Sequence, residues 1–322
     1  MVEINDRIMD DAIGGYFQLE LRQGEHYHKD ALRLNTARNC FEYILLARKY
    51  RKVYIPYYTC EVMLQPLERH HIEYEFYSID INFEPIETKT LKEGEAFLYT
   101  NYYGLKQDYV EKIAEIYGSS LMVDNAQAFY APRIEGIDTF YSARKYFGVP
   151  DGAYLYTDCK LDKKFPKDKS YMRMQHLLQR IDEGAEAGYN AFRVSDDSLD
   201  NLPIRAMSEL TDAILKNIDY ESVAKRRRDN FMSLHYALKT SNKLKIELKT
   251  EEIPMAYPFK TDIPNLRKVL IENKIFVAQY WTNVLEMCDD SAIEYRLATH
   301  IIPLPIDQRY DVDNMMRVIN TI

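Results

Sequence analysis

The chain of 322 residues is long enough for one large domain and a smaller one, because a single hydrophobic core stops growing beyond roughly 250–300 residues. Its 46% hydrophobic and 29% charged residues are typical of a globular protein. The net charge of −8 argues against nucleic acid as a partner, since binding to phosphates needs a basic surface.

Segments that would target the chain to a membrane or an oxidising compartment are not evident. No run approaches the roughly 20 apolar residues of a membrane span, so we expect no membrane partner. The start, MVEINDRIMDD, is acidic and does not have the pattern of a signal peptide. The cysteines are far apart and form no CxxC pair, which favours reduced thiols in a cytoplasmic protein; they are Cys40, Cys60, Cys159 and Cys288.

The histidine pairs and a basic run could be functional, but their patterns favour structural roles. The histidine pairs His26 with His28 and His70 with His71 have no third and fourth ligand at metal-site spacing, so we expect no metal. The basic run at 225–228 lies in a helical pattern, and such runs are typical of a solvated or subunit-facing helix side.

Strand and helix patterns alternate through the first half of the chain. The apolar spacing after residue 36 predicts a helix with Asn35 or Thr36 as its cap. The other helices expected in this half are 60–71 and 107–118, and the strands are 52–58, 72–80, 95–103, 119–124, 138–142 and 153–157. Repeated β-α-β units predict a mostly parallel central sheet with helices on both faces.

The second half has a weaker pattern. We expect a short amphipathic helix at 172–184, a loop at 188–203 and a long helical stretch at about 205–238. Two strand-then-helix units follow and close the chain. The sequence therefore predicts a large domain over 1–210 and a linking helix with a small C-terminal α/β domain over 211–322.

Polar side chains stand where strands of the predicted sheet end. Asn101, Asp124 and Ser142 lie at carboxyl ends, beyond which such sheets bind ligands. Lys145 follows Ser142 closely. A carboxylate that keeps a pyridine nitrogen protonated, and a lysine that forms a Schiff base, are what pyridoxal phosphate chemistry needs. Taken one at a time, these residues are equally typical of a helix cap, a turn or a surface loop.

Two short motifs resemble the DegT/DnrJ/StrS family of pyridoxal phosphate-dependent sugar aminotransferases. The family has a strand ending in D-x-A-Q and then S-x-x-K before a glycine turn; here they read DNAQ at 124–127 and SARK at 142–145. Other segments that resemble the family are LNTARNCFEYIL, IPYYTCEVML, TNYYGLKQD, IRAMSELTDAIL and HIIPLPID. The resemblance implies fold type I, the cofactor pyridoxal 5'-phosphate and a homodimer with shared active sites.

The resemblance also implies roles for single residues. Lys145 carries the cofactor as a Schiff base and moves protons, and Asp124 pairs with the pyridinium nitrogen. Gln127 lies near the ring hydroxyl, which Asn101 also reaches by its position alone. The phosphate is held by Ser142 and by backbone N–H groups at a helix start, around Ala37 and Arg38.

The chain departs from the family at three places. Ala37-Arg38 stands where Gly-Thr is common, and Cys60 stands where many members place an aromatic ring against the cofactor. Stacking then falls to Tyr58 or Tyr102, or is absent. Pro203 takes the place of an asparagine that reaches into the partner subunit's site.

The function that follows is an aminotransferase that moves an amino group from an amino acid to a carbonyl acceptor, with a keto-sugar nucleotide as the acceptor class that the family implies. Two alternatives stay open. One is other pyridoxal phosphate chemistry, such as elimination or decarboxylation. The other is a non-catalytic regulatory or binding protein that reuses the fold.

Overall fold

A seven-stranded sheet forms the centre of the computed structural model, which describes residues 13–322. The acidic start, interpreted above as no signal peptide, lies outside the described residues. The strand order is β1-β7-β6-β5-β4-β2-β3. The five neighbouring strands β3, β2, β4, β5 and β6 run parallel to one another. Strand β7 is antiparallel to both β6 and β1. The strands span Leu32–Leu34 (β1), Lys52–Pro56 (β2), Glu73–Tyr77 (β3), Glu95–Thr100 (β4), Leu121–Asn125 (β5), Asp138–Ser142 (β6) and Ala153–Tyr156 (β7). The mostly parallel α/β sheet is confirmed.

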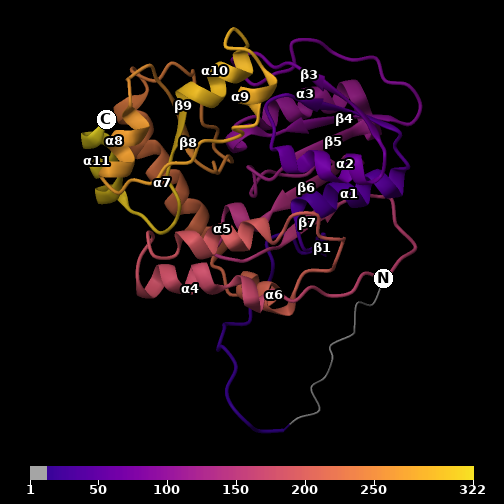
Figure 1. Cartoon of the computed structure of the whole chain (residues 1–322), viewed down its shortest axis with the longest axis horizontal. Coiled ribbons are helices and arrows are strands. Elements are labelled where there is room, and N and C mark those ends of the chain that lie inside the picture. Colours follow the sequence, from indigo (N-terminus) through magenta and orange to yellow (C-terminus); the bar gives the residue numbers. More distant parts are fainter. Residues whose placement is uncertain (1–12) are drawn as a thin grey trace.

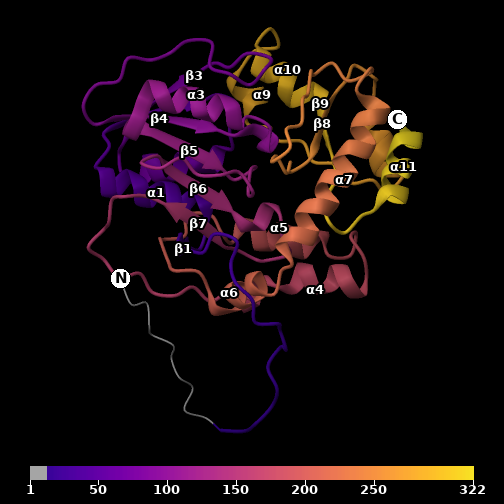
Figure 2. The same ribbon diagram turned by 180° about the vertical axis from the view of Figure 1, so that it is seen from behind.

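The alternation of side chains along each strand gives the sheet a core on both faces. In β4, Phe97 and Tyr99 point to one core, and Ala96 and Leu98 point to the other. Helix α3 covers the first face, and α1 and α2 cover the second (Figures 1 and 2). These helices span Ala37–Arg48 (α1), Leu64–Arg69 (α2) and Gln107–Tyr117 (α3). Helices on both faces are what the β-α-β pattern predicts.

Contacts at both ends of α1 set its direction. Thr36 is the cap, and its side chain accepts a hydrogen bond from the backbone N–H of Asn39 at 3.1 Å. At the other end, Arg48 pairs with the buried Asp138 through two hydrogen bonds of 2.8 and 2.9 Å. Because Asp138 begins β6 and Ser142 ends it, α1 runs antiparallel to β6. The N-terminus of α1 therefore lies at the carboxyl edge of the sheet.

The C-terminal part is a smaller α/β unit with a core of its own. The antiparallel pair β8–β9 packs against α7, α8 and α11, to the side of the large sheet (Figure 1). The bounds are Tyr220–Leu238 (α7), Tyr257–Lys260 (β8), Leu266–Glu272 (α8), Val284–Met287 (α9), Ile293–His300 (α10), Ile301–Leu304 (β9) and Val312–Thr321 (α11). The predicted boundary between 210 and 211 falls within a helix, α6 (Glu209–Lys216), and stays a prediction.

Two expectations about the helices of the second half are wrong. The long helix expected at 205–238 is two helices, α6 and α7, and Asp219 caps the second by accepting from the backbone N–H of Ser222 at 3.0 Å. The segment expected to be a loop contains α5 (Tyr189–Asp197). The polar composition of this segment favours a loop, but the segment forms a helix in which Ser195 is the only buried residue.

Helices α4 (Gln175–Asp182) and α5 form a pair at the periphery of the molecule (Figures 1 and 2). No residue of α4 is buried. Large apolar side chains of this segment are instead exposed: Tyr171, Met172, Leu178, Ile181, Tyr189, Phe192 and Val194. We call residues 171–198 the α4–α5 pair. Across residues 13–322, no helix combines the length and the apolar character needed to cross a membrane.

Candidate functional site

Asp124 is a buried carboxylate at the carboxyl end of β5. All five residues of this strand are buried, and the Asp124 residue is 6% exposed. Its Oδ1 accepts a hydrogen bond from the backbone N–H of Ala126 at 2.8 Å. Burial raises the pKa of Asp124 to about 6, although that N–H and the charge of Lys145 act in the opposite direction. The two residues thus lie close enough to interact electrostatically.

Ser142 and Lys145 lie on the neighbouring strand and the turn that follows it. β6 pairs with β5 so that Asp124 stands opposite Phe140, two residues before Ser142. A single 3₁₀ turn, Ala143–Lys145, then follows. Ser142 is 8% exposed, whereas the side chain of Lys145 is exposed. The sheet therefore brings together the acid, the hydroxyl and the lysine that the sequence placed at strand ends.

Gln127 and Asn101 hold loops at the same edge. The Oε1 of Gln127 accepts from the backbone N–H of Tyr103 at 2.9 Å. The Oδ1 of Asn101 accepts from the backbone N–H of Lys106 at 3.0 Å, and its Nδ2 donates to Gln107 at 3.4 Å. Asn101 is 0% exposed. Its amide is thus occupied in its own loop, which argues against the ring contact expected for it.

The start of α1 lies next to Ser142 through two backbone hydrogen bonds. Ala143 donates its N–H to the carbonyl of Gly152 at 3.0 Å, and Gly152 donates to the carbonyl of Asn35 at 2.6 Å. The backbone N–H groups of Ala37 and Arg38 are in the first turn of α1, where such groups have no partner within the helix. A helix start beside a serine hydroxyl is suited to bind an anion.

Arg144, which the motif search did not single out, and the side chain of Arg38 both form ion pairs at this edge. Arg144 pairs with Asp196 of α5 at 2.5 Å, and Arg38 pairs with Asp200 at 3.1 Å. Burial alone would raise the pKa of Asp196, but the positive charges of Arg144, Lys145 and Arg38 hold it below its usual value. Arg144 directly precedes Lys145 in the S-A-R-K motif, and that position was the only signal for it in the sequence.

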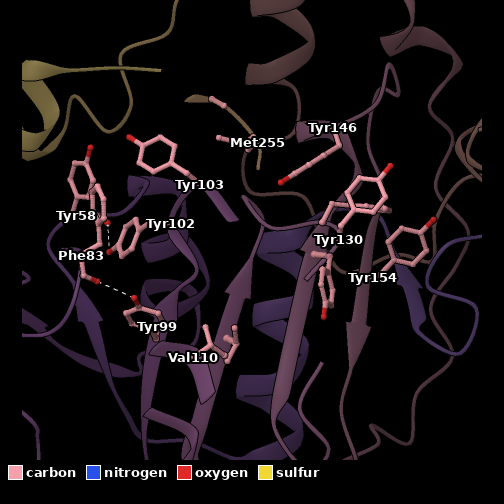
Figure 3. Close-up of a cluster of buried hydrophobic side chains, with 14 of the residues drawn as sticks. Tyr58, Phe83, Tyr99, Tyr102, Tyr103, Val110, Tyr130, Tyr146, Tyr154 and Met255 are labelled. Atoms are coloured by element: carbon pink, nitrogen blue, oxygen red, sulfur yellow. Dashed lines mark hydrogen bonds between the residues drawn. The ribbon is translucent and has the colours of Figure 1, made fainter. Parts of the chain in front are cut away.

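The rings expected to stack on a cofactor are part of the aromatic core. Tyr58 and Tyr102 stack on each other at 5.7 Å between ring centroids, and both contact the edge of Trp281. The hydroxyl of Tyr102 donates to the carbonyl of Tyr58 at 2.9 Å. Figure 3 shows this cluster at one end of the buried row of tyrosines. Both tyrosines are almost completely buried, so neither exposes a ring face.

The residues at this edge fit pyridoxal phosphate. Among residues 13–322, the only hydrogen bond to the Asp124 carboxylate is the one from Ala126, so its second oxygen can accept from a ring nitrogen. The helix start and the Ser142 hydroxyl make a donor set for a phosphate, with Arg144 in the turn that follows Ser142. Within the same residues no group of three or more His, Cys, Asp and Glu side chains is arranged to hold a metal ion.

The fold is that of the pyridoxal phosphate-dependent transferases of fold type I, as comparison with solved structures shows. No family model and no curated protein matches the chain. Three similar structures each cover 90% of this chain. DesV of S. venezuelae, in complex with a ketimine intermediate, is 16% identical at a TM-score of 0.61, over 83% of its own length. A DegT DnrJ EryC1 StrS aminotransferase from Brucella abortus is 15% identical at 0.58, over 85%. NtdA from Bacillus subtilis, with bound PMP, is 13% identical at 0.62, over 72%.

Proposed function

We propose that this protein is a pyridoxal phosphate-dependent aminotransferase that moves an amino group from an amino acid to a carbonyl acceptor. The observation that carries the proposal is the buried Asp124 carboxylate beside Lys145 at the carboxyl edge of a fold type I sheet. When bound, pyridoxal phosphate withdraws electrons from the carbon that bears the amino group, and it does so only while its ring nitrogen is protonated. Burying a carboxylate is unfavourable unless it is paired, so Asp124 is suited to hold that proton.

Each residue then has a role at a stated atom. Lys145 holds the cofactor through Nζ and, when Nζ is free, moves a proton to or from the substrate carbon. The Ser142 hydroxyl and the N–H groups of Ala37 and Arg38 bind the phosphate, and the ion pair of Arg144 with Asp196 lies beside it. Gln127 orients the ring from the loop that follows Asp124. With a protonated ring nitrogen beside it, the Asp124 carboxylate would stay ionised.

The acceptor class that we propose is a keto-sugar, carried as a nucleotide sugar. The support comes from the solved structures. One similar structure is described as DesI in the presence of its TDP-sugar product, and another as the sugar aminotransferase CalS13 from Micromonospora echinospora. Their TM-scores are 0.61 and 0.59.

Borohydride reduction of the protein loaded with pyridoxal phosphate, followed by peptide mapping, tests the assignment. We expect the cofactor label on Lys145 and on no other lysine, and we expect glutamate with a nucleotide-linked keto-sugar to yield 2-oxoglutarate. Label elsewhere would refute the role of Lys145. Label on Lys145 without 2-oxoglutarate from any keto-sugar would favour elimination or decarboxylation. No label and no absorbance change with pyridoxal phosphate would favour a non-catalytic binding protein.

We also propose a homodimer formed through the α4–α5 pair. This segment turns its charged side toward the site, where Asp196 pairs with Arg144, and leaves apolar side chains such as Ile181, at 81% exposed, on the outside. Large exposed apolar patches are typical of protein interfaces. A second copy of this chain would cover that face next to the site.

We place the protein in the cytoplasm. All four cysteines, Cys40, Cys60, Cys159 and Cys288, are free thiols in the structure. Unpaired cysteines are typical of reducing compartments.

A further inference from the structure

Tyr146, the residue after Lys145, connects the lysine turn to the turn that follows Asp124. Its side chain is buried, and its hydroxyl donates a hydrogen bond of 2.7 Å to the backbone carbonyl of Gln127. Its backbone N–H donates to the carbonyl of Ala143 at 3.0 Å, which closes the 3₁₀ turn that carries Lys145. One residue thus contacts both turns of the candidate site.

The C-terminal unit holds Tyr146 from the opposite side. Arg227 of α7 donates from Nη2 to the carbonyl of Tyr146 at 3.1 Å, and Gln308, beyond β9, donates from Nε2 to the same carbonyl at 2.8 Å. The Arg227 guanidinium also lies 4.4 Å from the centroid of the Tyr146 ring. In Figure 3, Tyr146 lies beyond the strand ends, in the region of Met255.

Arg227 carries a positive charge that is buried and held in place by its neighbours. It is 2% exposed, and burial lowers its pKa. Among residues 13–322 its hydrogen bonds go to neutral acceptors, namely the carbonyls of Tyr146 and Met255 and the Oε1 of Gln308, while the charge of Asp307 favours its ionised form. A buried cation without a carboxylate in contact depends on every one of these acceptors. Displacement of the Tyr146 backbone would therefore be costly.

The position of Lys145 depends on this backbone. Its side chain is exposed, so packing around the side chain does not determine where Nζ lies. The backbone of the turn fixes the point from which this side chain extends toward Asp124, and the turn is held through Tyr146. A lysine that must meet a cofactor held by Asp124 and Gln127 needs this kind of support from neighbouring residues, because a displacement of about 1 Å can cost roughly a hundredfold in rate.

We propose that Tyr146 is a positioning residue that fixes Lys145 relative to Asp124 and Gln127, and that Arg227 and Gln308 make the C-terminal unit part of this positioning. The proposal rests on the proposed function of Lys145 as the residue that carries the cofactor.

The variant Tyr146→Phe removes only the hydroxyl, which donates to the carbonyl of Gln127 and, at 3.4 Å, to that of Ile253. Its matched control is Tyr77→Phe, because Tyr77 of β3 is equally buried and donates to the carbonyl of Leu98 at 2.8 Å, on an edge strand away from Lys145. The first measurement is the pKa of Asp124 in the cofactor-free protein, read from the ¹³C signal of its labelled carboxylate. Because the charge of Lys145 lowers this pKa, loosening the lysine turn should raise it by about half a unit. Tyr77→Phe should leave it unchanged at an equal loss of thermal stability.

The second measurement is the turnover number of the loaded enzyme, which we expect to fall about tenfold in Tyr146→Phe and not in Tyr77→Phe. Arg227→Lys keeps a positive charge but lacks the planar fork that reaches several acceptors, and it should change both readouts in the same direction as Tyr146→Phe. If Arg227→Lys does not fold, Gln308→Leu is a milder substitution for the same two measurements.

Outcomes separate the two proposals. If borohydride fixes the cofactor to Lys145 in the unaltered protein, but Tyr146→Phe behaves like Tyr77→Phe in both readouts, Tyr146 is only a structural residue and the inference is overturned while the function stands. If no cofactor is fixed to Lys145 in the unaltered protein, the proposed function is overturned, and the positioning role is overturned with it.

Discussion

The edge of the sheet around Asp124 and the α4–α5 pair contribute to one site in opposite ways. At the sheet edge, buried parallel strands place Asp124 and Ser142 through backbone hydrogen bonds within a single chain. The α4–α5 pair buries almost nothing of itself and meets the site through charged side chains such as Asp196. The proposed cofactor chemistry therefore belongs to the part of the molecule that one chain makes rigid. The α4–α5 pair depends on contacts that we propose a second copy of the chain supplies.

The largest effect should come from Lys145→Ala. We expect the rate of amino transfer to fall at least about a thousandfold, because both the covalent attachment and the proton transfer use this side chain. The fold should not change, since the side chain is exposed. Single-turnover kinetics measure the loss, and Lys160→Ala, at another exposed lysine, is the control. If the variant keeps a tenth of the activity, the proposed role of Lys145 at the sheet edge is wrong.

Asp124→Asn should lower activity about a hundredfold and yet stabilise the cofactor-free fold. The pKa of Asp124 is raised from 3.8 to about 6, so the ionised carboxylate destabilises the folded state by about 3 kcal/mol above pH 6, and by nothing once pH falls below about 4. Asparagine has no such pH dependence and keeps the oxygen that accepts from Ala126. The free energy of unfolding, measured by urea at pH 4 and pH 8, should differ between the two proteins only at pH 8. An equal stability at both pH values would show that burial of this carboxylate carries no cost.

The sequence predicted the sheet edge well because strand ends follow from simple rules. Buried apolar runs that end in Asp124 and Ser142 favour strands of a mostly parallel sheet, because the strands before them alternate with helices. The cap of α1 was predicted at Asn35 or Thr36 because few residue types cap helices, and it is Thr36. Resemblance to the family then placed Lys145.

The features that the sequence did not show depend on contacts that form only in the folded chain. Asn101 looked free at its strand end, but the turn that follows bends back with Tyr103 at a φ of 58° and occupies its amide. The basic run at 225–228 was expected to be a solvated or subunit-facing helix side, and Lys225 and Arg226 are exposed. Arg227, however, is buried against Tyr146, because residues 28 to 81 positions away in the chain provide its acceptors. No local pattern marks an arginine that will be buried.

A charge on the outer face of the α4–α5 pair should separate the subunits of the proposed dimer. We expect Ile181→Glu to halve the molar mass measured by light scattering, because a carboxylate in an apolar interface loses its hydration without gaining a partner. The control is Ile116→Glu on α3, where an isoleucine is also exposed, at 55%. Thermal stability of the monomer should change little in either variant, since neither side chain is in the core. A monomeric unaltered protein would contradict the proposed interface.

The smallest effect should come from Asp196→Asn, and it tests whether the α4–α5 pair influences the sheet edge at all. Asp196 neutralises Arg144 beside the proposed phosphate site, and the pair is partly exposed, so its contribution is modest. Removing the carboxylate should strengthen cofactor binding about twofold to fivefold, measured by absorbance titration with pyridoxal phosphate, and the gain should vanish in roughly 1 M salt, where charges are screened. Asp197→Asn makes the same charge change one residue further on, at an exposed position, and should leave the affinity unchanged. An equal gain in both variants would show that net charge alone is responsible, and that the two regions are electrostatically independent.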